Sequence, residues 1–354
     1  ARAAGVRWLA AGADGGSDSV MDAVARAQEQ SAKLMGDSEV NVFDRVLKAQ
    51  QRDRSAVILG AVRGGEPVSM EVASGLIDRL GDVKRSFPTV LNVGGAGAVM
   101  AEHLSRTGMG VRTMIQTDIS LGQLAYTREH LARGGGLSGM SMLQVQAEEE
   151  FLPVKEGSCD AVISCLGLHW VNDLPGAMVQ CRKALKPDGL FLGAMLGGES
   201  LKELRIACLV AEQERDGGVS SRVSPLAQVS DAGNLLTRAG LVLTSVDVDT
   251  ITVHYPSAVE LVGHLRAMGE GNATNIRALG VKRDTAMAAA AVYQSMFGKE
   301  DGTVPATFQV IYMIGWAPDP SQPRSKRRGS ATVSISDLAD ALEKNAPKEE
   351  GGGK

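Results

Sequence analysis

The sequence predicts an α/β protein built on a doubly wound, mainly parallel sheet. Strand-length apolar runs alternate with helix-length amphipathic segments through the middle of the chain, and this alternation is typical of parallel strands joined by helices. The links between segments are short, as crossover connections in such sheets usually are. The first apolar run leads directly into the turn Gly94-Gly95-Ala96-Gly97, at the edge where open α/β sheets bind their ligands.

Two helices are expected before the sheet. Residues 1–40 are small and polar, so we expect an extended or disordered segment there, with a candidate helix at Ser19–Met35. The opening residues, ARAAGVRWLAAGA, contain two arginines and no acid, which fits either the end of an organellar transit peptide or a disordered terminus. Residues 41–56 and Ser69–Leu80 have apolar residues at helical spacing, and Ser69 is the expected N-cap of the second helix.

Five strands and three helices are expected in the core that follows. The strands are predicted at Thr89–Val93, Val111–Gln116, Met142–Ala147, Cys159–Cys165 and Gly189–Met195. The helices between them are predicted at Ala98–Arg106, Leu121–Ala132 and Pro175–Leu185. A Pro-Asp-Gly sequence within Lys186–Gly189 predicts a turn before the fifth strand.

The last third of the chain changes from alternating elements to helices flanked by two strands. Helices are predicted at Ser200–Arg215, Asp231–Ala239, Ser257–Gly269 and Arg283–Phe297, and strands at Leu241–His254 and Pro305–Trp316. The two strands suggest an antiparallel hairpin at the sheet edge, with a helical cap inserted between them. We expect one domain over residues 41–317, with its core at 85–198 and the cap or C-terminal insertion at 199–304, followed by a linker and tail at 318–354.

Composition and charge limit the class of protein. Hydrophobic residues make up 44% and charged residues 22% of the 354 residues, as in ordinary globular proteins. The formal net charge of −4 argues against a nucleic-acid-binding protein. No apolar run approaches the roughly 20 residues that a membrane-spanning helix needs, so no transmembrane segment is expected.

The cysteines and histidines do not predict a metal site. The four cysteines show no zinc-binding spacing, so we expect small buried core residues in a reducing compartment. An iron site of two histidines and one carboxylate would need a second histidine beside His169 and Asp173. The other four histidines have no suitable spacing.

Residues at the ends of three predicted strands predict a site for S-adenosylmethionine (SAM). Gly94, Gly95 and Gly97 would let the backbone approach the cofactor at a helix N-terminus, which favours its carboxylate. Asp118, followed by Ile119, ends the second strand and could accept hydrogen bonds from the ribose hydroxyls. Glu148 follows the third strand and would meet the adenine amine. Leu166 is assigned to the same site after the fourth strand, whereas Glu149 and Glu150 are expected to be solvated. These positions define a Rossmann-like, class I SAM-methyltransferase fold.

The glycine turn departs from the usual acid-x-Gly-x-Gly-x-Gly pattern of such sites. The matching segment runs from Asn92 to Ala98, so the acid is replaced by Asn92 and two glycines by Ala96 and Ala98. A Cβ at Ala96 would project where backbone and ligand meet. Either a one-residue shift lets Gly95 and Gly97 serve instead, or the fold is retained with an inactive pocket.

His169 and Trp170 follow the fourth strand at the ligand-binding edge of the sheet. His169 could act as a general base or contact a substrate, and Asp173 is the second candidate catalytic residue. The alternative is that His169 packs against Trp170 in the core.

Six longer segments resemble one family of mitochondrial proteins. They are NVFDRVLKAQQRDRSA (41–56), EEEFLPVKEGSCDAVISCLGLHWVNDLP (148–175), LKPDGLFLGAMLGGESLKELR (185–205), AEQERDGGVSSRVSPL (211–226), DTAMAAAAVYQSMFGKEDGTVPATFQVIYMIGW (284–316) and RGSATVSISDL (328–338). Together they resemble the complex I assembly factors of the SAM-methyltransferase-like class, whose studied members act as arginine hydroxylases. The bacterial malonyl-carrier-protein methyltransferase shares the fold but not the C-terminal segments.

The resemblance implies a protein of the mitochondrial matrix, either free or peripherally associated with the inner membrane. It implies complex I subunits or assembly factors as partners, an arginine of a quinone-module subunit as the target, and cofactor positions at Gly94, Asp118 and Glu148. By this resemblance, the family has Asp, Cys, Gly and Gly at four positions of the cofactor turn. This chain has Asn92, Gly95, Ala96 and Ala98 at those positions. Two functions therefore stay open: an active arginine-modifying enzyme, or a catalytically inactive scaffold or accessory subunit of a respiratory complex.

Overall fold

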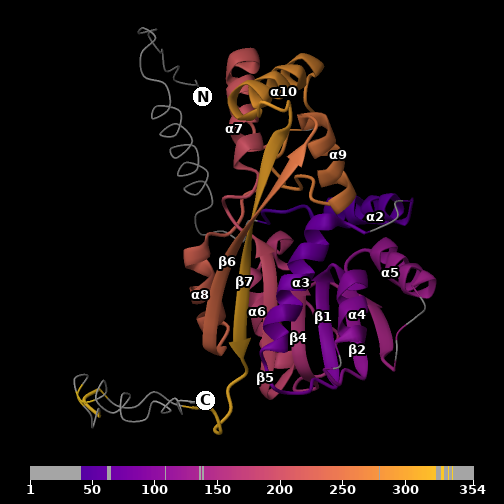
Figure 1. The fold of residues 1–354 in the computed structure, drawn as a ribbon, viewed down its shortest axis with the longest axis vertical. Helices are drawn as coiled ribbons and strands as arrows, with labels where there is room; N and C mark the ends of the chain where they lie inside the picture. Colours follow the sequence, from indigo (N-terminus) through magenta and orange to yellow (C-terminus); the bar gives the residue numbers. More distant parts are fainter. Residues whose placement is uncertain are drawn as a thin grey trace, which may run out of the picture. The chain divides into compact units, whose positions relative to one another are not determined.

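A seven-stranded sheet with the order β3-β2-β1-β4-β5-β7-β6 organises the chain (Figure 1). Its strands are β1 (Thr89–Gly95), β2 (Thr113–Asp118), β3 (Ser141–Gln146), β4 (Cys159–Cys165), β5 (Leu185–Leu196), β6 (Val242–Tyr255) and β7 (Val304–Trp316). The first five strands pair in parallel, and β7 pairs antiparallel to both β5 and β6. The predicted doubly wound sheet and its antiparallel edge hairpin are confirmed.

The computed structural model describes residues 41–61, 65–107, 109–134, 137, 139–278, 280–323, 328–330, 334 and 337. The chain divides into a large unit that ends at Pro318 and a smaller one that begins at Asp319. The candidate helix at Ser19–Met35 and most of the predicted tail lie outside the described residues. Among the described helices, none is long and apolar enough to cross a membrane.

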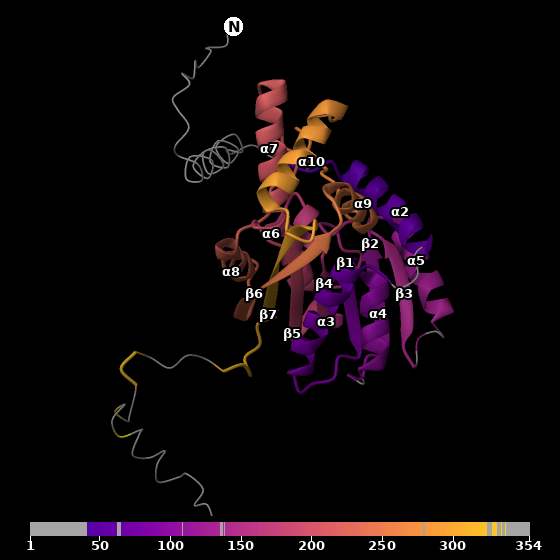
Figure 2. The same ribbon diagram turned by 45° about the horizontal axis from the view of Figure 1, so that its top comes forward.

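Helices cover both faces of the sheet and extend beyond one end of it. They are α2 (Arg45–Ala61), α3 (Pro67–Gly81), α4 (Gly97–Arg106), α5 (Leu121–Arg133), the 3-10 turn η1 (Leu168–Trp170), α6 (Leu174–Ala184), α7 (Lys202–Asp216), α8 (Val229–Arg238), α9 (Ala258–Met268) and α10 (Arg283–Phe297). In Figures 1 and 2, α3 and α4 lie on one face of the sheet and α6 and α8 on the other. The helices α7, α9 and α10 gather beyond the end of the sheet, so the predicted cap between β6 and β7 is present.

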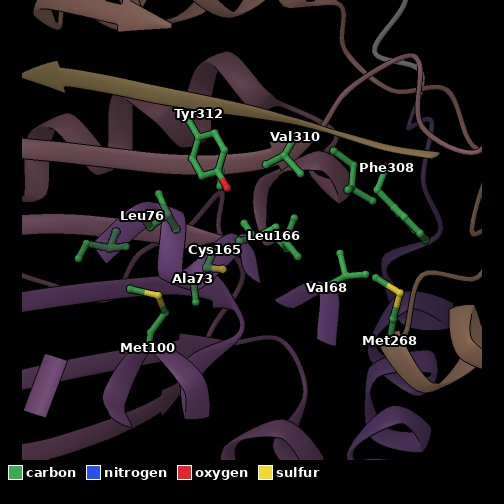
Figure 3. Packing of buried hydrophobic residues seen from close by; sticks show 14 of the residues in the cluster. Val68, Ala73, Leu76, Met100, Cys165, Leu166, Met268, Phe308, Val310 and Tyr312 are labelled. Carbon is green, nitrogen blue, oxygen red and sulfur yellow. The ribbon is translucent and has the colours of Figure 1, made fainter. Parts of the chain in front are cut away.

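The core on the α3 face ties the sheet to the cap. Leu76 of α3 and Tyr312 of β7 are both buried in one cluster of apolar side chains, and Val68 lies beside Met268 of α9 (Figure 3). Burying a large aliphatic side chain contributes about 1.5–3 kcal/mol, so this cluster holds α3 on the sheet. Helix α9 itself packs mainly on α2, where the Ser55 hydroxyl donates to the Ala267 carbonyl at 2.6 Å. Glu270, two residues beyond the last residue of α9, is thereby held at the carboxyl edge of the sheet.

One local prediction was wrong, and another holds only within the bounds of a strand. The N-cap of α3 is Glu66 rather than Ser69, because Pro67 starts the helix and the Glu66 carboxylate accepts hydrogen bonds from the Val68 and Ser69 amides at 2.8 and 2.5 Å. The predicted turn Lys186–Gly189 lies inside β5, where the register with β4 shifts. Register pairing with β4 and β7 resumes only at Leu190, and Asp188 has a φ of +59°, so the chain turns locally within the bounds of β5.

Three of the four cysteines are buried, as predicted. Cys159, Cys165 and Cys181 are free and buried, and Cys208 is half-buried. Burial raises the pKa of Cys181 to about 12 and that of Cys208 to about 11, so both thiols are protonated near neutral pH and serve as packing residues.

Candidate functional site

The glycine turn between β1 and α4 is shaped by contacts within the chain. Gly94 and Gly95 have φ angles of +61° and +74°, in the region that favours glycine. A Cβ at Gly95 would lie 1.7 Å from the Cys165 carbonyl oxygen, and one at Gly97 would lie 2.0 Å from Nε2 of Gln116. Gly95 is therefore required for folding whether or not a ligand binds, whereas a Cβ at Gly97 would have to displace the Gln116 side chain. Ala96 is the N-cap residue of α4 and makes no side-chain capping bond.

Asp118 at the end of β2 is paired with an arginine from α2. Its carboxylate accepts from Arg52, with Nε 3.1 Å from Oδ1 and Nη2 2.5 Å from Oδ2. The Arg52 Nη2 also donates to the Gly95 carbonyl at 3.1 Å, and the Ser120 amide donates to Asp118 Oδ1 at 2.9 Å. Both partners of this ion pair are buried. Arg52 therefore bridges the acid and the glycine turn that were both predicted to contact a cofactor.

Glu149, rather than its neighbour Glu148, turns into the site. Glu149 is buried and forms an ion pair with Arg45, which also donates from Nη1 to the Trp170 carbonyl at 2.8 Å. Burial raises the pKa of Glu149 above its ordinary value. Glu150 accepts from two backbone amides at the start of α6, whereas Glu148 is half-buried. The expectation that Glu149 and Glu150 are solvated was wrong, because α2 and the β4–α6 loop supply partners for them.

His169 is buried beside a carboxylate that comes from the cap. Its Nε2 lies 2.9 Å from Oε2 of Glu270, and the Trp170 indole Nε1 donates to the same oxygen at 2.8 Å. The His169 Nδ1 has no hydrogen-bond partner among the described residues. Interactions with His169, Lys48 and Trp170 outweigh desolvation and lower the pKa of Glu270 to about 2, so this carboxylate is ionised throughout the physiological range.

Helix α2 presents three cations to three acids. Arg45, Lys48 and Arg52 are spaced i, i+3 and i+7, which places them on one helical face. Lys48 Nζ donates to the Gly269 and Gly271 carbonyls at 3.0 and 2.9 Å and lies 3.1 Å from the centroid of the Trp170 indole ring. The sequence identified none of these cations as functional, although three charges on one face of a predicted amphipathic helix were visible.

The remaining predicted site residues divide into two groups. Leu166 has a φ of +59°, and with Gly95 and Gly97 it lines a cavity beside the glycine turn. Ile119 is buried next to Asp118. Asp173 is exposed and caps α6 by accepting from the Gly176 amide at 2.9 Å, so its carboxylate has a structural role. Within the described residues, no group of three or more His, Cys, Asp or Glu side chains could hold a metal ion.

Two cavities meet at Glu270. The cavity beside the glycine turn has a volume of about 50 Å³. A second one, of about 180 Å³, lies among the loop after β5, the start of α7 and α9. Glu270 lines both, so it forms part of the wall between a cofactor-side space and a cap-side space.

The polar groups at this edge of the sheet suit SAM, but the adjacent cavity is too small for SAM while Arg52 stays in place. The fit consists of the positive-φ glycine turn, the uncapped N-terminus of α4 and a carboxylate at the end of β2. However, Arg52 occupies both oxygens of that carboxylate, and the adjacent cavity of about 50 Å³ is far below the roughly 300 Å³ at which small-molecule pockets begin. An adenosyl group would have to displace the Arg52 side chain.

Lys48 predicts a pH-dependent stability. Desolvation lowers its pKa from 10.5 to about 7, so above pH 7 the unfolded chain binds a proton that the folded chain has lost. The free energy of unfolding should therefore rise with pH, by about 2 kcal/mol between pH 7 and pH 9. A Lys48→Met variant lacks this term. In urea unfolding, the stability of the wild type relative to Lys48→Met should increase over that interval.

The exposed Lys84 provides the control, because Lys84→Met should follow the wild type at every pH. A stability difference between the wild type and Lys48→Met that stays constant from pH 7 to pH 9 would show that Lys48 keeps its proton in the folded chain.

Comparison with known proteins defines first a class and then a family. Residues 91–193 match the family model of a methyltransferase domain, which together with the sheet order identifies a SAM-methyltransferase fold. The chain is 46% identical over 300 residues to "Arginine-hydroxylase NDUFAF5, mitochondrial" of Danio rerio, covering 85% of this chain and 90% of the relative. It is 45% identical over 305 residues to the Homo sapiens protein of that name, covering 84% of each. The chain belongs to the family of arginine-hydroxylase NDUFAF5, and the resemblance stated from the sequence is confirmed.

A second group of relatives is more distant. The malonyl-[acyl-carrier protein] O-methyltransferase of Gallionella capsiferriformans is 30% identical over 277 residues, covering 75% of this chain and 88% of the relative. The fold is thus shared with a protein named as a methyltransferase, whereas the higher identity is to proteins named as arginine hydroxylases.

Proposed function

We propose that this chain is a mitochondrial protein that acts on an arginine side chain of a complex I subunit during assembly of the complex. The observation that carries the proposal is the 46% identity to a mitochondrial arginine hydroxylase, which extends over 85% of this chain and therefore includes the cap as well as the sheet. The quinone module is the expected location of the target. The matrix, with or without peripheral contact to the inner membrane, is the expected compartment.

SAM is the proposed cofactor, bound at the carboxyl edge of the sheet after Arg52 has left Asp118. Gly94, Gly95 and Gly97 would hold it with Asp118, Ile119 and Leu166, and either Glu148 or Glu149 would face its adenine. When bound, SAM would supply a sulfonium-activated group at this edge. The chain's own residues would exclude water: α2 covers the site, and Trp170 with Phe43 closes it beneath α2. His169 can hold a proton at Nδ1, since its Nε2 is engaged with Glu270.

Disrupting the gene in the organism that carries it tests this function. We expect complex I to stall as a smaller intermediate on native gels, and one arginine of a quinone-module subunit to lose its modification, measured by peptide mass spectrometry. Reintroducing the wild-type chain should restore both. Normal complex I with an unchanged arginine in the disrupted line would contradict the proposal.

A non-catalytic scaffold is the second candidate, and the Arg52–Asp118 pair favours it. This buried pair fills the place that a ribose would occupy, and Asn92 and Ala96 depart from the usual glycine turn. Complementation with the double variant Asp118→Leu, Arg52→Met distinguishes the two functions, because it removes both charges together. Restored complex I without the modified arginine would favour the scaffold, whereas loss of both would favour the enzyme.

A further inference from the structure

The cavity of about 180 Å³ beneath the cap has no role in the cofactor site described above. Most of its wall is apolar and is formed by Leu196 at the end of β5, Leu201 and Leu204 around the start of α7, and Leu265 of α9. The indole of Trp170 also contributes. A cavity with such a wall binds the apolar part of a ligand. Any charged group of the ligand must lie at one of the few polar side chains of the wall.

Almost every polar side chain around this cavity already has a partner. Arg222 is paired with Glu212 and donates from Nη1 to the Gly280 carbonyl at 2.8 Å. Ser224 donates to Oδ1 of Asn272 at 3.0 Å, and the Asn272 side-chain nitrogen donates to the Ser221 carbonyl. These groups shape the cavity but have little capacity left to bind a ligand.

Among the described residues, Glu270 and Arg266 are the exceptions, and of these two side chains only that of Glu270 is mostly buried. The hydrogen bonds from His169 and Trp170 both reach its Oε2, and among the described residues no hydrogen bond reaches Oε1. Because this carboxylate is ionised and mostly buried, it keeps a strong need for a cationic hydrogen-bond donor. The two donors to Oε2 also fix the orientation of the carboxyl group, so its free oxygen is positioned before a ligand arrives.

The charges that face this carboxylate still favour a cationic ligand. Lys48 and Arg52 both attract this carboxylate electrostatically. Their hydrogen bonds, however, go to the Gly269 and Gly271 carbonyls and to Asp118 rather than to Glu270. Arg266 also lines the cavity, but it is exposed, so water and salt screen its charge. An anionic ligand would instead have to approach the buried Glu270 carboxylate at close range, which is costly.

We propose that this cavity receives the side chain of the arginine on which the chain acts, with its guanidinium bound to Glu270 and its methylene stem along Leu201, Leu204 and Leu265. A guanidinium is flat, permanently charged and suited to carboxylates, and the arginine stem packs well on apolar surface. Glu270 also lines the cavity at the glycine turn. An arginine bound to Glu270 would therefore lie next to the proposed SAM site. The inference rests on the proposed function and adds the residues that select the substrate.

The Trp170 indole provides a direct measurement, because its N–H donates to the same carboxylate. The full chain would be titrated with N-acetyl-arginine amide, with N-acetyl-citrulline amide as the uncharged counterpart, while the indole N–H signals are followed by NMR. Trp170→Phe assigns the signal among the three tryptophans of the chain. We expect a saturable shift with the arginine compound and none with the citrulline compound.

Glu270→Gln is the matched variant, since glutamine keeps one acceptor oxygen for His169 and Trp170 and replaces the other oxygen by an uncharged NH2 group. It should weaken binding of the arginine compound by about tenfold or more, whereas Glu214→Gln, at an exposed acid on α7, should leave it unchanged. Equal shifts with both compounds, no saturable shift, or unchanged affinity in Glu270→Gln would overturn the inference.

Different experiments test the proposed function and the assignment of this cavity. If gene disruption abolishes the arginine modification but the arginine compound does not bind at Glu270, the function stands and the assignment of this cavity is overturned. If the compound binds as expected but gene disruption changes neither complex I nor its arginine, the cavity stands as a guanidinium site and the proposed function does not.

Discussion

Asp118→Ala is expected to lower the free energy of unfolding by about 3–5 kcal/mol, because it leaves the Arg52 guanidinium buried without its counterion. Arg52 donates to both oxygens of Asp118, and both residues are buried. Arginine cannot lose its proton to relieve this cost. The carbonyl of Gly95 would be its one remaining acceptor among the described residues.

Urea unfolding of the purified chain measures this loss, and two variants make it specific. Asp78→Ala removes an exposed carboxylate from α3 and should change stability by less than about 0.5 kcal/mol. The double variant Asp118→Leu, Arg52→Met removes both charges and should recover most of the stability, since apolar replacement of a buried pair is often close to neutral. A loss below about 1 kcal/mol for Asp118→Ala would mean that water reaches Arg52.

Arg52→Met is expected to bind SAM about tenfold or more tightly than the wild type. In the wild type the ribose must displace Arg52 from Asp118 before it can reach the carboxylate. In the variant, Asp118 has lost its partner and methionine leaves more room, so the ribose hydroxyls would satisfy an acceptor that is otherwise unpaired. Calorimetric titration measures both affinities.

Arg54 is the matched control because it is an exposed arginine on the same helix. Arg54→Met should bind SAM as the wild type does. If Arg52→Met bound SAM more weakly than the wild type, Arg52 would be a ligand-binding residue rather than a competitor of the ligand.

The fold was predictable because its signals are local. The strand Cys159–Cys165 was predicted with both ends correct, since a buried apolar run there lies between Gly157 and Gly167. The helix Arg283–Phe297 was also predicted with both ends correct. The edge hairpin followed from two long strands that flank a helical segment, and the pairing of β6 with β7 confirms it.

The site was less predictable because its partners are distant in sequence. Arg45 and Glu149 are 104 residues apart, and His169 and Glu270 are 101 residues apart. The sequence could not say which of Glu148, Glu149 and Glu150 turns inward, because α2 decides this by supplying Arg45 to Glu149. Glu270 follows a helix end and belongs to no motif, so only the packing of α9 against α2 reveals its position.

Calorimetric titration of the purified wild-type chain with SAM tests the central claim most directly. We expect saturable binding of one SAM per chain, weaker than that of Arg52→Met, because the ligand must first displace Arg52 from Asp118. An absence of binding up to millimolar SAM in both proteins would contradict it. The carboxyl edge would then be permanently closed by α2, and the function of the chain would depend on the surfaces that contact its partners.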